Sequence, residues 1–217
     1  MKPNPLTPIL KDLKSDSDYV HCPWVCLTFD DGPDPDYTPK ILDILAEHNV
    51  HANFFVLGSA AKQYPQLIKR MIDEGHVVGN HTYSHFHPWT ISSRRARVEV
   101  TRTSQVIRRI VGESPRWFRP PHGRLRKAML EQVHNENMHT VLWNHSIIDW
   151  GPLGTEQGIA QRLHDIKFGD IVLMHDGARE HNHPELLIKQ LPTFVKNLNT
   201  RGIRTVTLDQ VYPAVAA

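Results

Sequence analysis

The chain has 217 residues, which is long enough to bury a sizeable core and short enough for a single α/β domain. Its 25 basic and 23 acidic residues give a formal net charge of only +2, and this balance argues against nucleic acid as a partner. Two cysteines are too few for a disulfide framework, and no stretch reaches the ~20 apolar residues of a transmembrane segment.

The first segment, residues 1–22, precedes the first predicted strand and is interpreted as an N-terminal extension of one folded domain over residues 23–217. Its opening, MKPNPLTPILKDLKSDSD, lacks the apolar block of a secretory signal. We therefore expect a cytoplasmic protein unless a leader precedes the given chain.

Short apolar runs of β type then alternate with longer segments of helical period. Strands are predicted over residues 24–29, 52–58, 76–81, 115–121, 139–144, 170–175 and 203–208. Helices are predicted over residues 37–49, 59–75, 91–112, 126–137, 155–166 and 184–202. This alternation predicts a mostly parallel sheet with helices packed outside it, either closed into a barrel or left open. Such architectures carry their chemistry beyond the carboxyl ends of the strands.

Titratable or cationic side chains follow five of the predicted strands. In chain order these groups are Asp30 with Asp31, His81 with His85, Arg119 to Gly123, Asp149 with Trp150, and His175 with Asp176. Because the carboxyl ends of parallel strands share one face, the groups should lie on the same side of the molecule. Their clustering predicts a functional site there.

The stretch HTYSH spaces two histidines, His81 and His85, four residues apart. On a helical turn this spacing puts both imidazoles on one face, where they can bind one cation. In a chain with 15 histidines the pair alone is more typical of a structural or surface role. The zinc-peptidase pattern also needs Glu after the first histidine, and Thr82 in that place weakens the peptidase alternative.

The stretch TFDDGPD puts two carboxylates, Asp30 and Asp31, at the end of an apolar run. Adjacent side chains of a regular strand face opposite sides, but Gly32 and Pro33 end the strand, so both carboxylates could approach one site. There they would repel each other unless a cation lay beside them. One Asp would complete a site with two histidines and leave room for water, and the other could take a proton from that water. The residues alone do not say which Asp does which.

Five motifs together resemble the NodB-type polysaccharide deacetylases of carbohydrate esterase family 4. They are TFDDGPD, HTYSH, RPPHG, DW and LMHD, in this order over roughly residues 24–210. The first two motifs are specific, and the short last three count mainly through their order. The resemblance implies a distorted (β/α)7 barrel, so residues 23–217 would be the NodB homology catalytic domain.

The resemblance also separates the roles of the two carboxylates. Asp30 is the implied general base, and the implied metal ligands are Asp31, His81 and His85. Two histidines and one carboxylate favour Zn²⁺ as the single divalent cofactor, with Co²⁺, Mn²⁺ or Fe²⁺ as alternatives.

Further roles are implied for the remaining motifs. Arg119 would orient and tune Asp30, Asp149 would tune the general acid His175, and the backbone N–H of residue 122 would help to hold the oxyanion. The residues implied in substrate binding are Pro120, Pro121, His122, Gly123, Trp150 and Leu173. Members of the family often have Tyr in place of His122, which puts the sugar contacts of this chain in doubt.

The implied function is metal-dependent removal of acetyl groups from N-acetylated glycans such as chitin or peptidoglycan. Acetyl-xylan esterase activity is a variant, and a non-catalytic carbohydrate-binding protein with the same fold is the alternative from another class. An acetylated glycan is therefore the expected partner.

Several aromatic residues have two interpretations. Trp89 follows the histidine motif and either stacks on a sugar ring or packs in the core, whereas Trp117 and Trp143 lie in strand-like runs and are predicted as core. Four histidines could lie near the pocket rim, although a surface role is more typical: His87, His145, His181 and His183.

Overall fold

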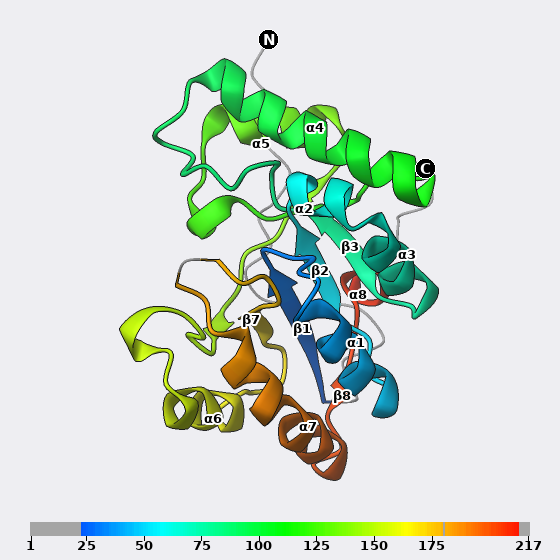
Figure 1. Ribbon diagram of the computed structural model, residues 1–217, viewed down its shortest axis with the longest axis vertical. Helices are drawn as coiled ribbons and strands as arrows, with labels where there is room; N and C mark the ends of the chain where they lie inside the picture. Colours follow the sequence, from blue (N-terminus) through cyan, green and yellow to red (C-terminus); the bar gives the residue numbers. More distant parts are fainter. Residues whose placement is uncertain (1–22, 180, 213–217) are drawn as a thin grey trace.

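The computed structural model describes residues 23–179 and 181–212, and its centre is a parallel β-sheet (Figure 1). The strands are β1 (Trp24–Asp30), β2 (Asn53–Val56), β3 (Val77–Asn80), β4 (Trp117–Phe118), β5 (His139–Thr140), β6 (His145–Ser146), β7 (Ile171–His175) and β8 (Arg204–Thr205). Their order in the sheet is β5-β4-β3-β2-β1-β7-β6, with β8 paired to the start of β1. The pairings are parallel, so the strands share one carboxyl edge.

Helices pack around this sheet, with α4 and α5 at one end of Figure 1, α6 and α7 at the other, and α1 and α3 along one side. Their bounds are α1 (Thr38–Glu47), α2 (Gly58–Gln63), α3 (Pro65–Asp73), α4 (Ser93–Val111), α5 (Lys127–Asn135), α6 (Glu156–His164), α7 (Pro184–Thr200) and α8 (Leu208–Val211). Two short 3-10 turns, η2 (Pro121–Gly123) and η3 (Gly151–Leu153), follow β4 and β6.

The sheet is an incomplete barrel whose two edges are β5 and β6. Residues 141–144 cross between these edges: the backbone N–H of Val141 donates to Phe118 of β4, and that of Asn144 donates to Ile171 at the start of β7. The chain thereby leaves one edge of the sheet and joins the other. This arrangement confirms the predicted α/β fold, a distorted (β/α)7 barrel.

The strand prediction for residues 139–144 was wrong in detail. The strand ends at Thr140, and a separate strand, β6, begins at His145. A single straight strand over residues 139–144 could not pair first with β4 and then with β7, which lie at different ends of the sheet order.

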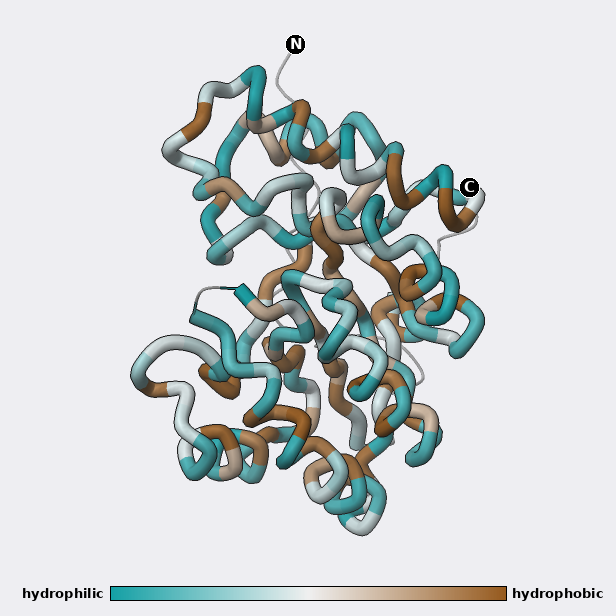
Figure 2. The backbone as a smooth tube through the Cα atoms, in the orientation of Figure 1, coloured by the Kyte–Doolittle hydropathy of each residue, from teal (hydrophilic) through white to brown (hydrophobic). Residues whose placement is uncertain are grey.

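Strand β1 is buried along its whole length and sends alternate side chains into two cores. Leu27 and Phe29 pack into the larger apolar cluster under the helices, while Trp24 and Cys26 join a smaller cluster that includes Trp117. Figure 2 shows the apolar residues concentrated along the central strands. A strand that is covered on both faces has a continuous run of apolar residues in its sequence. This is why the segment could be predicted from the sequence.

The predicted helix over residues 59–75 is two helices, α2 and α3, that meet at Tyr64. Pro65 lacks a backbone N–H and disfavours helical geometry in the residue before it. Tyr64 accordingly has φ −125° and ψ 57°.

Residues 1–22 lie outside the described residues, so the predicted N-terminal extension stays a prediction.

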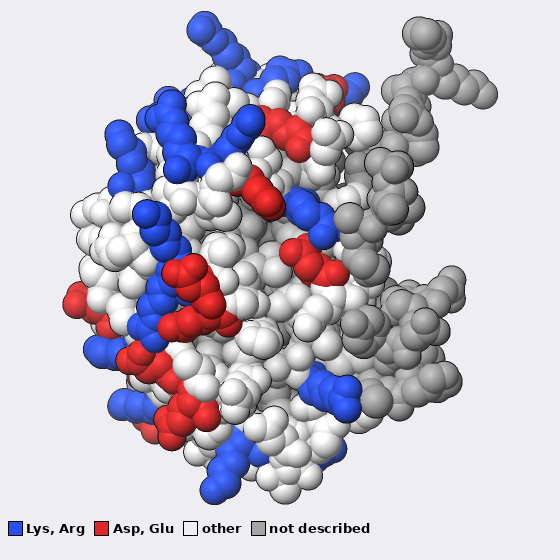
Figure 3. Space-filling view, turned by 90° about the vertical axis from the view of Figure 1, so that its right-hand side faces the viewer, with Lys and Arg blue, Asp and Glu red and all other residues white. Residues whose placement is uncertain are grey.

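Charged side chains of both signs are interspersed on the side that carries α1 and α3 (Figure 3). Arg70 of α3, for example, pairs with Asp43 of α1 at 2.6 Å and with Glu74 at 2.7 Å. Within the described part of the chain, none of the helices is both long and apolar enough to span a bilayer.

Candidate active site

A cavity of about 400 Å³ lies beyond the carboxyl ends of the strands and gathers most of the predicted site residues. Its lining consists of Asp30, Asp31, His81, His85, His122, Trp143, Trp150, Leu173, His175, Arg179, His181 and Asn182. A second cavity of about 420 Å³ between α6 and α7 is lined mainly by apolar and amide side chains. The titratable cluster therefore singles out the first cavity as the candidate active site.

The turn after β1 brings both carboxylates of TFDDGPD to the cavity. Asp30 is the last residue of the strand, and the chain changes direction at Asp31, whose φ of +76° is rare for a residue with a side chain. The turn thus begins one residue before Gly32, earlier than the sequence predicted. Gly32 is needed next because a Cβ there would overlap the buried carboxylate of Asp176.

The segment HTYSH is a bent loop and not the helical turn that the spacing suggested. Thr82 and His85 have φ values of +70° and +57°, and Glu99 of α4 accepts the backbone N–H groups of Tyr83 at 3.1 Å and Ser84 at 2.7 Å. This loop brings the rings of His81 and His85 to a centroid distance of 5.0 Å. The two imidazoles therefore meet through loop geometry held by α4.

Asp31, His81 and His85 form a group that could hold a metal ion, with one candidate ligand atom from each lying within 4.8 Å of the others. The Oδ1 atom of Asp31 lies 3.2 Å from Nε2 of His85 and 3.7 Å from Nε2 of His81. This oxygen is buried and has no hydrogen-bond partner among the described residues, which is costly unless a cation lies beside it.

Both imidazoles can present a ring nitrogen to a cation. Nδ1 of His81 lies 2.7 Å from the carbonyl of Arg119, and donation to that carbonyl leaves the Nε2 lone pair facing Asp31. Burial, and then the charge of His81, hold the pKa of His85 far below its usual range, so this ring stays neutral. The donor set of two imidazole nitrogens and one carboxylate fits a divalent metal.

Asp30 is held from behind by the guanidinium of Arg119, whose Nη1 donates to Asp30 Oδ1 at 2.8 Å and to Thr28 Oγ1 at 2.7 Å. The other carboxylate oxygen, Oδ2, lies 3.7 Å from His81 Nε2. Arg119 is fully buried and also donates to two backbone carbonyls at 3.3 and 3.1 Å. One oxygen of Asp30 is thus anchored while the other faces the histidine cluster.

His175 and Asp149 form a second buried pair, and His175 stands opposite Asp30 in the pairing of β7 with β1. One oxygen of Asp149 lies 2.8 Å from Nδ1 of His175, and the other accepts the backbone N–H of His175 at 2.7 Å. Burial lowers the pKa of His175, but the charge and hydrogen bond of Asp149, and then the charges of Asp31 and Asp30, bring it to about 9. His175 therefore carries a proton at neutral pH.

The RPPHG segment forms a tight turn, η2, at the rim of the cavity. His122 and Gly123 both have positive φ values, +56° and +63°, and a Cβ at Gly123 would come within 2.8 Å of the Trp143 ring. His122 lines the cavity, whereas Pro120 and Pro121 are buried below the rim and shape the turn.

The family profile described as polysaccharide deacetylase matches residues 18–141 of this chain. The chain belongs to this family. A peptidoglycan-N-acetylglucosamine deacetylase of Bacillus cereus is 36% identical over 188 residues, which cover 87% of this chain and 68% of the relative. A chitooligosaccharide deacetylase of Sinorhizobium fredii is 40% identical over 156 residues, which cover 71% of this chain and 73% of the relative.

Two solved structures of related proteins share the fold of this chain. The Bc1960 peptidoglycan N-acetylglucosamine deacetylase superimposes with a TM-score of 0.83 at 33% identity, covering 94% of this chain and 92% of that chain. A pseudoenzyme of the same esterase family from Bacillus anthracis has a TM-score of 0.77 at 29% identity, covering 88% of this chain and 66% of that chain. The fold alone therefore does not guarantee turnover, which depends on the side chains in the site.

The cavity also contains residues that the sequence did not predict there. Trp143 packs against the smaller apolar cluster, as predicted, but it is only partly buried and also lines the cavity, which was not predicted. Arg179 and Asn182 were not predicted, although they follow β7 as the other site residues follow their strands. Asn182 donates from Nδ2 to Asp31 Oδ2 at 2.9 Å and to the Gly177 carbonyl at 3.0 Å.

The remaining predicted residues divide between the cavity and its surroundings. Trp150 and Leu173 line the wall, and the Trp150 ring meets the His175 ring edge-on at 5.2 Å. Among the histidines proposed for the rim, His181 lines the cavity. His145 lies elsewhere, with Nε2 at 2.8 Å from the Arg162 carbonyl of α6.

Proposed function

We propose that this protein is a metal-dependent hydrolase that removes acetyl groups from N-acetylated glycans. One observation carries the proposal: a carboxylate anchored by Arg119, a group of side chains that could hold a metal ion, and a histidine, His175, paired with a buried carboxylate, open into one cavity. The named deacetylases among its relatives support the same reaction, and their names support peptidoglycan or chito-oligosaccharides as the substrate class.

The cofactor of this proposal is one divalent cation held by Asp31, His81 and His85. When bound, such an ion polarises a carbonyl oxygen and makes water a stronger nucleophile at neutral pH. Two imidazoles and one carboxylate favour Zn²⁺, although Co²⁺, Mn²⁺ and Fe²⁺ accept the same ligands.

Asp30 is the proposed general base. Its free oxygen faces the histidine cluster and takes a proton as a water oxygen attacks the amide carbon. Arg119 anchors the second oxygen, so the base is held in one orientation before the substrate arrives.

The departing nitrogen requires an acid, because an amine leaves poorly without a proton. His175 gives its Nε2 proton to that nitrogen as the C–N bond breaks, which yields acetate and a free amine on the sugar. Asp149 keeps Nδ1 protonated and stabilises the charged ring. The backbone N–H of His122 is the proposed donor to the tetrahedral oxyanion. Trp150 and Leu173 are the proposed contacts of the methyl group of the acetyl substituent.

Acetate release is the test of this function. Chelator-treated protein should release little acetate from chito-oligosaccharides, and adding back Zn²⁺, Co²⁺, Mn²⁺ or Fe²⁺ should restore the release. Acetylated xylan, assayed beside them, separates amide from ester preference. Binding of these glycans without acetate release by the metal-loaded protein would instead support a carbohydrate-binding protein. The pseudoenzyme from Bacillus anthracis is a precedent for this fold without catalysis.

Two substitutions separate the roles of the adjacent carboxylates. Asp30→Asn should lower kcat by ~10²-fold or more and leave metal binding intact, because the amide cannot act as a base. Asp31→Asn should instead weaken metal binding. If Asp30→Asn loses the metal and Asp31→Asn keeps it, the proposed roles are reversed.

A further inference from the structure

Trp89 is a large apolar side chain that stands at the surface instead of in the core. It lies in the loop that follows His85, and 61% of it is exposed. This exposure excludes the core-packing interpretation of the sequence. Of the described residues, only a few large apolar side chains are exposed: Ile72, Phe86, Trp89, Val98, Leu153 and Phe168.

The indole is held in one orientation. Its Nε1–H donates to the Leu125 carbonyl at 3.1 Å, and the backbone N–H of Trp89 donates to Nδ1 of His87 at 3.3 Å. The loop itself is tied down by Arg126, whose Nη1 donates to the Pro88 carbonyl at 2.6 Å. Because the indole N–H is already used, the surface that Trp89 offers to a ligand is its apolar ring.

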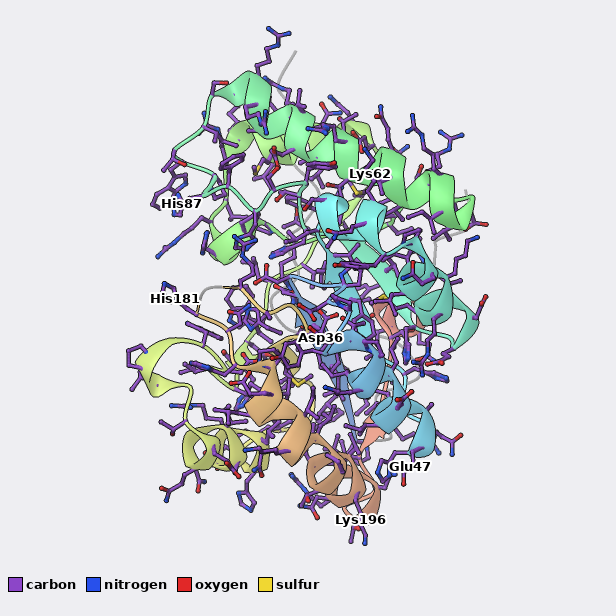
Figure 4. All side chains as sticks on the ribbon, viewed as in Figure 1. Asp36, Glu47, Lys62, His87, His181 and Lys196 are labelled. Atoms are coloured by element: carbon purple, nitrogen blue, oxygen red, sulfur yellow. The ribbon has the colours of Figure 1, made fainter. Side chains whose placement is uncertain are left out.

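A row of rings connects Trp89 with the cavity. The His87 ring meets the Trp89 ring edge-on at 5.4 Å, and the same His87 ring lies 5.1 Å from the ring of His122, which lines the cavity. Figure 4 shows His87 on the same side of the molecule as His181 of the cavity lining, each on a loop from a different half of the barrel. The exposed indole thus continues the wall of the active site outward.

The neighbours of the indole suit a sugar. A pyranose ring has an apolar C–H face that packs on an aromatic ring, and a rim of hydroxyl and carbonyl oxygens that accept hydrogen bonds. The guanidinium of Arg124 lies over the Trp89 ring, 5.3 Å from its centre, and brings several N–H donors to this surface. The exposed part of the indole suits the apolar C–H face of a sugar, and the guanidinium that lies over the ring supplies donors for its oxygens.

We propose that Trp89, with Arg124 and His87 beside it, forms a further binding subsite for a sugar ring of the glycan chain, outside the cavity that receives the acetylated unit. The inference rests on the proposed function, because it takes the glycan to be the substrate. The subsite is reached by long chains only, so it selects oligomers over short substrates.

Kinetics with substrates of different length test the subsite. Trp89→Ala should raise KM for a chito-pentasaccharide by about tenfold, as stacking on an aromatic ring typically contributes. The KM for the disaccharide and kcat for both substrates should stay unchanged. Trp89→Phe keeps an aromatic ring and should recover most of the loss. Phe168→Ala is the matched control, because Phe168 is 53% exposed and packs on Trp24 at the start of β1.

Binding measured by calorimetry keeps this test separate from turnover. If the parent protein releases no acetate but binds the pentasaccharide about tenfold more tightly than Trp89→Ala, the subsite stands and the proposed function fails. Equal binding by the two proteins, or no pentasaccharide binding by either, overturns the subsite. An equal loss for the disaccharide and the pentasaccharide also overturns it, since Trp89 would then act on the cavity itself.

Discussion

The pair formed by His175 and Asp149 shows how a single carboxylate sets the protonation of a neighbour. Asp149 is fully buried, and both of its carboxylate oxygens contact His175. One oxygen bonds to the ring, and the other accepts the backbone N–H. Burial alone would lower the pKa of His175, and the nearby negative charges overcome that effect. The acid form therefore persists up to a pH of about 9.

We predict that Asp149→Asn lowers kcat by ~10²-fold or more and moves the alkaline limb of its pH profile to lower pH. The amide oxygen can still accept the backbone N–H, but its NH₂ group would face Nδ1 and favour the neutral ring. The pH dependence of kcat measures the shift. Asp165→Asn, at the residue that follows α6, is the control. An unmoved alkaline limb in Asp149→Asn would contradict the role given to this pair.

Asn182 donates a hydrogen bond to Asp31, one of the three proposed metal ligands. Its amide fixes one oxygen of Asp31, which leaves the other oxygen directed at the two histidines. Groups that orient a metal ligand in this way typically contribute 10- to 100-fold to metal affinity. We therefore expect Asn182→Ala to weaken Zn²⁺ binding by about that factor.

Competition with a fluorescent chelator measures this affinity without any turnover. Asn199→Ala, in the exposed last turn of α7, is the matched control and should bind Zn²⁺ as the parent does. Equal affinity of Asn182→Ala and the parent would show that Asp31 needs no support from Asn182.

At the scale of elements, α4 supports the loop that carries the two histidines. Glu99 is fully buried on α4, and one of its oxygens accepts two backbone N–H groups of that loop, while Arg95 donates to the other at 2.9 Å. Asn80, at the end of β3, adds a further bond by accepting the N–H of Thr82 at 2.8 Å. The loop is therefore held from both a helix and a strand.

Glu99→Ala should lower the free energy of unfolding by about 1–3 kcal/mol, because two partly buried N–H groups lose their acceptor. It should also weaken metal binding, since the loop loses its support. Chemical denaturation and chelator competition measure the two effects. Glu131→Ala removes an exposed ion pair with Arg97 and should cost less than about 1 kcal/mol, so a similar loss in both variants would argue against a special role for Glu99.

At the scale of the whole molecule, Asp176 couples folding to pH. Burial, and then the charge of Asp31, raise its pKa from 3.8 to about 7, although a hydrogen bond from Thr38 opposes this. In the unfolded chain the carboxyl loses its proton near its ordinary pKa, whereas the folded chain retains the proton up to about pH 7. The folded state thus loses stability as the pH rises through this window.

Asp176→Asn cannot ionise and should escape that loss. In metal-free protein, we expect the variant to gain unfolding temperature relative to the parent at pH 8, and to lose most of this advantage near pH 4. Thermal unfolding at both pH values measures the difference. Asp36→Asn, an exposed control near the start of α1, should show no such pH dependence. A difference between Asp176→Asn and the parent that is the same at both pH values would contradict the shifted pKa.

The sequence by itself determined the alternation of strands and helices and the strand ends at which the chemistry gathers. Burial on both faces makes β1 and β7 continuous apolar runs, and a parallel sheet must bring their carboxyl ends to one edge. The two aspartates, the two histidines and His175 could be predicted for that reason, because their strand positions imply proximity.

Only the tertiary structure decided how those residues face each other. The positive φ of Asp31, the bent loop of His81 to His85, the crossing at residues 141–144 and the exposure of Trp89 depend on contacts between distant segments. Local patterns report periodicity and burial but not the partners of a loop. The place of Trp143 in the cavity lining was therefore not predicted, and Asn182, whose importance comes from a hydrogen bond to a residue 151 positions away, was missed.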